Sequence, residues 1–262
     1  MKPILSLYLL DLENFKKDRD IENSIDLLSN RLGKEQREKL LRIHDRKKTE
    51  FVLSRSLLKF ALDRHLKEGI KMPKGYWQIR EREQLPPKIE NVEAENLQFS
   101  ISHSQSIVSI TCCLSNQRIG FDIQACKQFS NFQQGLETAK YFCNDKQLAV
   151  LSEIATDQNM RLFSSTYTLY WSLKEAYFKA LHQGIHNESL KNTSFEPCTI
   201  NKAKCLTRMY QNALQAHFQI AVYHSKPFTI ETHQLEIENS LIKISNHFPI
   251  TNIGWEGFRI RN

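Results

Sequence analysis

Two short segments of the sequence contain residues that could act together on a phosphate ester. The first reads I-G-F-D-I-Q over residues 119–124 and places Asp122 inside a short apolar stretch, where a carboxylate is unfavourable unless it is paired or metal-bound. The second reads W-S-L-K-E-A-Y-F-K over residues 171–179 and, as a helix, places Lys179 one turn after Glu175. Two carboxylates can share one Mg²⁺, and a nearby lysine can neutralise phosphate oxygens. Together the segments predict metal-assisted attack on a pyrophosphate.

Each signal has a simpler interpretation when it is taken alone. Asp122 could cap a turn at its strand end, and Glu175 with Lys179 could form an ordinary ion pair on a solvated helix face. A third segment, F-S-I-S-H-S at residues 99–104, could bind an anion through imidazole and hydroxyl donors or could form a capped surface turn. Gly120 permits close approach of a ligand or of another backbone.

These residues need elements that hold them in place, and the hydrophobic pattern predicts such elements. Apolar residues recur at helical spacing in residues 21–68, 133–155 and 160–183, the last ending near Gly184. Alternating or β-branched runs predict strands at residues 4–10, 97–102, 107–114, 119–123 and 214–223. Residues 71–96 are broken by prolines and glycine and read mostly as loop. The order of these elements predicts two α/β halves joined near residues 115–119.

Composition and charge narrow the class of protein. The chain has 262 residues with 36 Lys and Arg against 29 Asp and Glu, which gives a formal net charge of +7. This excess favours anionic partners, such as nucleotides, nucleic acid, acidic proteins or a lipid surface, without choosing among them. No RNP-like aromatic box, zinc finger or helix-turn-helix pattern stands out, which argues against a nucleic-acid partner.

The chain shows no signal for a membrane or a secretory location. The apolar stretch at residues 4–10 is closed by Asp11 and Glu13, and no run approaches the roughly 18 apolar residues of a membrane span. The six cysteines have no CxxC spacing, which argues against structural zinc and fits free thiols in a reducing compartment. We expect a cytoplasmic protein with no membrane partner.

In order along the chain, the three segments resemble the motifs of the 4′-phosphopantetheinyl transferases of the larger, two-half surfactin-synthetase type. That family's pattern has an S-H-S segment, a G-x-D-x-E segment and a W-S-x-K-E-(A/S)-x-x-K segment. The run from Arg46 to Lys59 is similar to the family's R-x-x-F-x-x-(A/S)-R-x-L-L-R helix. The resemblance spans residues 35–225. It implies an α+β fold of two pseudo-symmetric halves, 1–116 and 117–262, each a small antiparallel sheet packed with a long helix.

The resemblance also implies an activity. A protein of this family would use Mg²⁺ and transfer the 4′-phosphopantetheine arm of coenzyme A to a serine of an acidic acyl or peptidyl carrier protein, releasing 3′,5′-adenosine bisphosphate. Asp122, Glu175 and Gln124 would hold the metal in the C-terminal half, and Lys179 would contact the phosphates. We expect a monomer with coenzyme A bound between the halves.

The N-terminal half would bind the adenosine side of coenzyme A. By resemblance, Ser102 and His103 would contact its phosphates, with His103 on the 3′-phosphate. Basic residues would extend this anion site, namely Arg55, Lys39, Lys47 and Lys48.

The sequence departs from the family pattern at three places. Gln124 stands where the second carboxylate of G-x-D-x-E would be, which predicts weaker metal binding. The G-K-P segment has no clean match at residues 84–86, where Lys88 could substitute. Lys146 stands where a carboxylate proposed as general base would be, so that Asp145 or a metal-bound water would have to serve.

Two other classes of function compete with this one. The changes at Gln124 and Lys146 could mark a non-catalytic module that binds coenzyme A or a carrier, which Mg²⁺-dependent turnover would distinguish. A basic nucleic-acid-binding protein is the third reading, and salt-sensitive binding to nucleic acid would test it.

Overall fold

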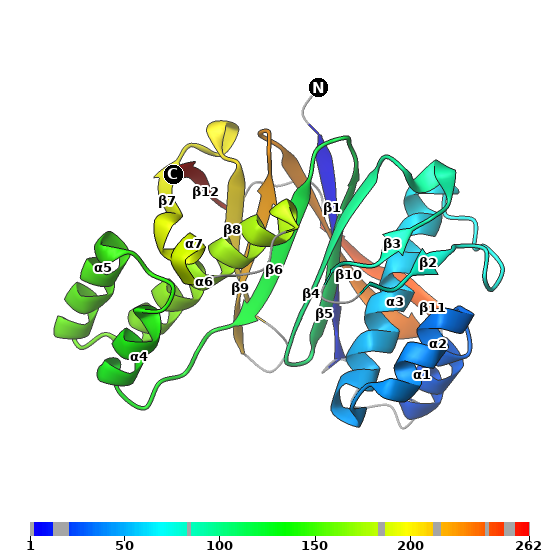
Figure 1. Ribbon diagram of the computed structural model, residues 1–262, viewed down its shortest axis with the longest axis horizontal. Coiled ribbons are helices and arrows are strands. Elements are labelled where there is room, and N and C mark those ends of the chain that lie inside the picture. Colours follow the sequence, from blue (N-terminus) through cyan, green and yellow to red (C-terminus); the bar gives the residue numbers. More distant parts are fainter. Residues whose placement is uncertain are drawn as a thin grey trace. The chain divides into compact units, whose positions relative to one another are not determined.

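The computed structural model describes residues 3–12, 21–82, 85–182, 187–211, 216–238, 241–248 and 255–261. Figure 1 shows its helices and strands, which form the mixed α+β structure that the sequence predicted. The chain divides into two compact units. Unit 1 comprises Met1–Gln117 and Thr229–Thr251, and unit 2 comprises Arg118–Phe228 and Asn252–Asn262.

Unit 1 contains a five-stranded sheet in the order β11-β10-β1-β5-β4. Its strands are β1 (Ile4–Asp11), β4 (Leu97–Ser104), β5 (Ile107–Leu114), β10 (Thr229–Glu238) and β11 (Leu241–Phe248). Strand β1 is central and buried along all but its first residue, because it has a neighbour on each side and a core beside it.

One pair in this sheet departs from the antiparallel sheet that we expected. Strands β1 and β10 are parallel, with Ile4 opposite Thr229, whereas the other three pairs are antiparallel. A parallel pair needs a long connection, and here the chain passes through the whole of residues 118–228 before β10 begins.

The helices of unit 1 are α1 (Ile21–Ser29), α2 (Lys34–Arg42) and α3 (Asp45–Leu66), so the helical pattern at residues 21–68 belongs to three helices. Helix α3 packs on β5, and its apolar face supplies a core of fully buried side chains, namely Leu53, Leu57, Leu58, Ala61 and Leu62. Gly69 follows the helix with φ +81° and donates its N–H to the Asp63 carbonyl at 2.9 Å, which caps the helix end as predicted. The segment after it forms the short hairpin of β2 (Ile79–Arg80) and β3 (Lys88–Ile89), followed by a 3₁₀ turn at Val92–Ala94.

Unit 2 contains a second five-stranded sheet, in the order β6-β9-β8-β12-β7, and all its pairs are antiparallel. Its strands are β6 (Ile119–Ala125), β7 (Ser194–Cys198), β8 (Cys205–Gln211), β9 (His217–His224) and β12 (Glu256–Arg261). Its helices are α4 (Phe132–Ala139), α5 (Asp145–Thr156), α6 (Met160–Leu181) and α7 (Asn187–Asn192), with a 3₁₀ turn at Ile200–Lys202. Helix α6 lies along β6 and β9 (Figure 1). The predicted end near Gly184 lies outside the described residues.

The single helix expected at residues 133–155 is two helices. Helix α4 ends at Ala139, and α5 begins after Asn144. The Asn144 side chain accepts the N–H of Gln147 at 3.0 Å, while the Gln147 side-chain oxygen accepts the N–H of Asn144 at 3.3 Å. This reciprocal capping box fixes a new helix start at N-D-K-Q, a signal that the hydrophobic period does not carry.

The two units share one arrangement of strands and helix. In unit 1 the first strand pairs with the last of three, giving β1-β5-β4, and in unit 2 the same order gives β6-β9-β8. A helix of 22 residues follows the first strand in sequence order within each unit, α3 in one and α6 in the other. The two units therefore repeat one topology, as the predicted pseudo-symmetric pair of α/β halves requires.

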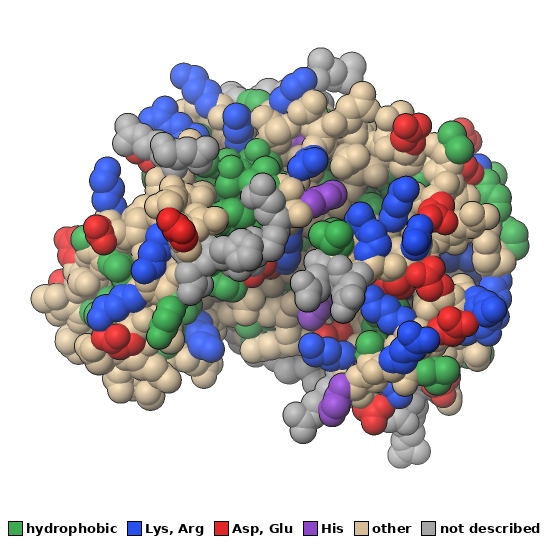
Figure 2. All heavy atoms as spheres, in the orientation of Figure 1, with side chains coloured by type: hydrophobic (Ala, Val, Ile, Leu, Met, Phe, Trp, Pro, Cys, Tyr) green, Lys and Arg blue, Asp and Glu red, His purple; other side chains and the backbone are tan. Residues whose placement is uncertain are grey.

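Two further observations concern the helices and the surface. Within the described residues, no helix is long and apolar enough to cross a membrane. Figure 2 shows Lys and Arg side chains spread over both units and interspersed with Asp and Glu on the face in view. On that face the charge of +7 is not gathered into one continuous basic patch.

Candidate active site

The structure brings Asp122, Glu175 and Lys179 together within unit 2. Asp122 projects from β6, while Glu175 and Lys179 lie one turn apart on α6. The ammonium Nζ of Lys179 lies 2.7 Å from Asp122 Oδ1 and 3.7 Å from Glu175 Oε2. Both carboxylates therefore lie within reach of one common cation. The predicted juxtaposition of the two motifs holds at this site.

Gly120 is what allows α6 to lie this close to β6. A Cβ atom at position 120 would stand 1.8 Å from the carbonyl oxygen of Ala176 and 2.8 Å from the backbone nitrogen of Ala180. Of the two interpretations that the sequence left open for Gly120, the structure selects approach of another backbone. The small residues on both elements bring the backbone of α6 onto the strand, which places Asp122 beside the lysine.

The carboxylates of this cluster are largely buried, which affects the pKa of Glu175. The Asp122 side chain is 4% exposed, that of Glu175 17% and that of Lys179 29%. Burial raises the pKa of Glu175, and the negative charge of Asp122 raises it further against the opposing effect of Lys179. Glu175 thus holds its negative charge at a cost, and a cation placed between the two carboxylates would lower that cost.

The donor set suits Mg²⁺ in kind. Magnesium takes oxygen ligands and binds through one or two carboxylates together with waters and substrate phosphates. Asp122 and Glu175 supply two carboxylates, and Gln124 lies two residues after Asp122, on the same face of β6 because side chains alternate along a strand. Among the described residues, no group of three or more His, Cys, Asp or Glu side chains could hold a metal. The fit therefore relies on two carboxylates, with an amide where a third oxygen donor would stand.

Lys174 is a functional-looking residue that the sequence analysis did not single out. It is fully buried, and its Nζ donates to the carbonyls of Phe142 at 2.5 Å and Leu190 at 2.6 Å. Burial lowers the pKa of Lys174 to about 8. It ties α6 to the end of α4 and to α7, so the lysine of W-S-L-K-E is structural while Lys179 belongs to the charged cluster. The signal in the sequence that could have identified Lys174 was the position of a lysine on the apolar side of the predicted helix.

Comparison with known families gives a match to the part of the chain that contains β6 and α6. Residues 118–237 match the family model described as the 4′-phosphopantetheinyl transferase superfamily. This segment is a phosphopantetheinyl transferase superfamily domain. The match covers a little under half of the chain and contains Asp122, Gln124, Glu175 and Lys179. None of the curated proteins matches the chain.

The residues predicted to bind the adenosine side of coenzyme A lie outside the matched transferase segment, in unit 1. Ser102 is buried on β4, where its carbonyl accepts a hydrogen bond from the hydroxyl of Ser109 at 3.0 Å. The His103 side chain is half exposed, and its Nδ1 lies 3.3 Å from Glu50 Oε2. The imidazole thus faces a carboxylate at this distance.

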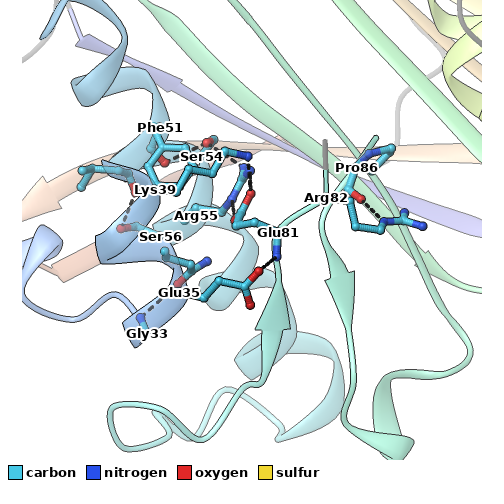
Figure 3. A network of polar contacts seen from close by, with 12 residues as sticks. Gly33, Glu35, Lys39, Phe51, Ser54, Arg55, Ser56, Glu81, Arg82 and Pro86 are labelled. Carbon is cyan, nitrogen blue, oxygen red and sulfur yellow. Dashed lines mark hydrogen bonds and ion pairs between the residues drawn. The ribbon is translucent and has the colours of Figure 1, made fainter. Parts of the chain in front are cut away.

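Arg55 and Lys39 do come together, around an internal carboxylate. Arg55 donates from Nε to Glu81 Oε1 at 2.5 Å and from Nη2 to Glu81 Oε2 at 2.7 Å, and Lys39 Nζ reaches Oε2 at 2.8 Å. Figure 3 shows both basic side chains converging on Glu81. The Glu81 side chain is 6% exposed, and although burial alone would raise its pKa, the contacts with Arg55 and Lys39 lower it below the usual value. In this structure the two cations therefore share one carboxylate of the protein itself, which balances only one of their two charges.

The remaining predicted residues lie on the surface. Lys47 is exposed on α3, and Lys48 pairs with Asp45 on the same helix at 2.7 Å. Asp145 and Lys146 are exposed in the first turn of α5. Lys88, offered for the missing G-K-P lysine, is exposed on β3, and Gln84 lies outside the described residues.

Proposed function

We propose that this chain transfers the 4′-phosphopantetheine arm of coenzyme A to a serine of an acyl or peptidyl carrier protein, with Mg²⁺, as the surfactin-synthetase type of this superfamily does. The observation that carries the proposal is the cluster of Asp122, Glu175 and Lys179, inside the segment that matches the superfamily. The other expectations, a monomer in the cytoplasm and an acidic carrier, belong to the same proposal.

The cluster provides charges of the kind that transfer requires. Asp122 and Glu175, with Gln124 beside them on β6, would hold Mg²⁺, which when bound would draw negative charge away from the pyrophosphate oxygens. Lys179 now serves as counter-ion to both carboxylates. A divalent cation would take over that role, and the ammonium would then be available to a phosphate oxygen.

The proposed transfer involves the following bond changes. The serine Oγ forms a bond to the β-phosphorus of coenzyme A, and the bond from that phosphorus to the bridging oxygen breaks. The electron pair leaves with 3′,5′-adenosine bisphosphate. The serine proton passes to a base. The sequence offers Asp145 for this role, because Lys146 stands where the family pattern has the carboxylate proposed as general base. On the adenosine side, the phosphates of coenzyme A would be contacted by Ser102, His103, Arg55, Lys39, Lys47 and Lys48. Arg55 and Lys39 would first have to release the Glu81 carboxylate and then bind the phosphates.

Intact-mass spectrometry tests the activity directly. Several apo carrier proteins would be incubated with the full chain, coenzyme A and Mg²⁺. We expect one carrier or more to gain the mass of one phosphopantetheine, and we expect EDTA to prevent the gain. No gain on carriers of the fatty-acid, polyketide and peptide classes would overturn the proposal.

Glu175→Gln tests the site within the same assay. Removing the charge of one of the two carboxylates should lower turnover by at least about 100-fold, because charge stabilisation carries most of this chemistry. Stability should change by less than about 1 kcal/mol, since the amide keeps the side-chain shape. The matched control is Glu137→Gln, an exposed carboxylate on α4 of the same unit. Normal turnover in Glu175→Gln would remove Glu175 from the site.

A second candidate is a module that binds coenzyme A or a carrier without transferring. The observation that favours it is the internal pairing of Glu81 with Arg55 and Lys39, added to Gln124 in place of a carboxylate. Detectable binding of coenzyme A by calorimetry, together with no mass gain on any carrier, is the result that this candidate predicts.

A further inference from the structure

Unit 1 contains a cavity of about 280 Å³, and among its described lining residues Arg55 alone is also proposed to bind coenzyme A. It is bounded by α1, α2, α3, the segment of residues 69–79 and β11. Leu28, Leu32 and Trp77 are buried side chains of its wall, and Phe60 completes an apolar surface. Apolar atoms, including the carbon atoms of the charged side chains, form most of the lining surface, which is typical of sites for small organic molecules.

Positive charge gathers around this apolar wall. Lys59, Arg64 and Lys71 line the cavity, and Arg31 lies beside them. Asp63 is the one carboxylate among the described lining residues, and its Oδ1 accepts the indole N–H of Trp77 at 2.7 Å. The cavity therefore presents more positive than negative side chains to whatever enters it.

The cations are close enough to influence one another. Burial lowers the pKa of Lys59, and the positive charges of Lys71 and Arg31 lower it further against the opposing effect of Asp63. Lys59 is held in place by hydrogen bonds from its Nζ to the carbonyl of Met72 at 3.1 Å and to that of Pro73 at 3.5 Å. An anion in the cavity would relieve this repulsion.

Gln36 provides an independent sign of a ligand. It lines the cavity and is only 4% exposed. Its Oε1 accepts the N–H of Gly33 at 3.1 Å, which fixes the orientation of the amide. The other amide atom, Nε2, is buried and has no hydrogen-bond partner within the described part of the chain. A buried donor without an acceptor is unfavourable, and an acceptor atom on a bound molecule would satisfy it once the amide turns toward the cavity.

We propose that this cavity binds a small amphiphilic anion, with an apolar chain or ring against Leu28, Leu32, Phe60 and Trp77 and a carboxylate or phosphate toward Lys59, Lys71 and Arg64. The amide N–H of Gln36 donates to the same ligand. Arg55 lies at the edge of the cavity, but Glu81 already holds its guanidinium. The side chains proposed to contact the amphiphilic anion therefore do not include those assigned to coenzyme A.

Calorimetric titration of the full chain with four probes tests both parts of the proposal. Octanoate and octyl phosphate carry both an apolar chain and a charge, 1-octanol lacks the charge, and inorganic phosphate lacks the chain. We expect the two amphiphilic anions to bind at least about tenfold more tightly than the other two probes, and their affinity to fall with added salt. Whichever of the two binds more tightly identifies the head group. Equal binding of 1-octanol, or no binding of either anion, would overturn the proposal.

Three variants locate the binding. Gln36→Glu keeps an acceptor for the Gly33 N–H but replaces the donor with a negative charge, so octanoate affinity should fall by at least about tenfold. The double change Lys71→Gln with Arg64→Gln affects exposed side chains and should weaken binding to a similar degree. Lys74→Gln is the matched control, because Lys74 is exposed on the same segment and does not line the cavity. Unchanged affinity in the first two variants, or an equal loss in the control, would place the probe elsewhere.

Discussion

At the scale of single residues, α6 shows how one helix uses two lysines differently. Lys174 and Lys179 lie in the same motif, yet Lys174 is fully buried on two backbone carbonyls and Lys179 reaches two carboxylates. The difference comes from helical geometry, since residues five apart point in different directions. A lysine without a carboxylate beside it must find neutral acceptors or lose its proton.

Lys174→Met tests this assignment through the pH dependence of stability. Removing the donor leaves the carbonyls of Phe142 and Leu190 without it, so we expect a loss of about 3 kcal/mol at pH 7. The pKa of Lys174 is lowered to about 8 from 10.5, so the unfolded chain binds a proton between these values that the folded chain does not. This group therefore makes wild-type stability rise with pH over that window. Denaturant unfolding from pH 7 to 10.5 measures it.

The informative quantity in that experiment is the difference between wild type and variant, because other groups also titrate at high pH. We expect the difference to be constant below pH 8 and to grow from pH 8 to 10.5. Lys191→Met, on an exposed lysine of α7, is the control and should change neither the free energy of unfolding nor its pH dependence. A difference that does not depend on pH would contradict a lowered pKa.

Gln124→Glu tests the amide that stands in place of a carboxylate. A negative charge on the same face of β6 as Asp122 adds a charged oxygen ligand, which should bind Mg²⁺ more tightly. We expect half-maximal transfer at a Mg²⁺ concentration at least about tenfold lower than in the wild type. The measurement is the transfer rate against Mg²⁺ concentration. An unchanged or higher requirement would show that Gln124 is not a ligand.

At the scale of elements, the site depends on the contact between β6 and α6. Three residues of the strand contribute to it in alternation: Gly120 meets the helix backbone, Asp122 meets Lys179, and Gln124 lies on the same face. Leu173, Ala176 and Ala180 of α6 form the buried apolar surface around this contact. A fixed strand and helix therefore position the charges, which makes their geometry reproducible.

Gly120→Ala should disturb this contact. The added methyl group would stand 1.8 Å from the Ala176 carbonyl oxygen, so the helix must move. We expect a loss of about 3 kcal/mol in stability and a large loss of transfer activity, because overpacking shifts backbone and site together. Gly33→Ala is the control, since its methyl group would meet only Gln36 Oε1 at 3.7 Å. Thermal unfolding and the mass assay measure both effects, and wild-type behaviour of Gly120→Ala would contradict the close approach.

At the scale of the whole molecule, the end of the chain completes both sheets. After β9 the chain enters unit 1, where β10 pairs with β1, and then returns to unit 2, where β12 lies between β8 and β7. Each unit therefore depends on residues that are distant in sequence. The pairing of β10 with β1 covers an edge of a strand that is buried along all but its first residue.

Two truncations separate these contributions. A chain ending at Phe248 keeps β10 and β11 and loses β12, so amide exchange should accelerate in β7 and β8 while β1 and β5 stay protected. A chain ending at Phe228 also exposes the edge of β1, and we expect it to lose cooperative unfolding altogether. Hydrogen exchange and circular dichroism provide these measurements. Equal protection of β1 in both truncated chains would contradict the role of β10.

The sequence by itself predicted the kind of chemistry and most of the elements. Apolar periodicity predicted a long helix at residues 160–183 and strands at 97–102, 107–114 and 119–123, because those patterns depend only on local geometry. The structure has these elements at Met160–Leu181, Leu97–Ser104, Ile107–Leu114 and Ile119–Ala125. Motif order identified the superfamily to which residues 118–237 match. The sequence also marked Asp122, Glu175 and Lys179 as one group, since a buried carboxylate needs a partner.

Only the tertiary structure decided the contacts that join distant parts of the chain. It placed Gly120 against a helix backbone, gave Lys174 two carbonyls and paired Arg55 and Lys39 with Glu81. It also paired β10 with β1 across the length of unit 2 in sequence. These contacts depend on how separated elements pack, and no local pattern of hydrophobicity or charge specifies the partner of a side chain that lies dozens of residues away.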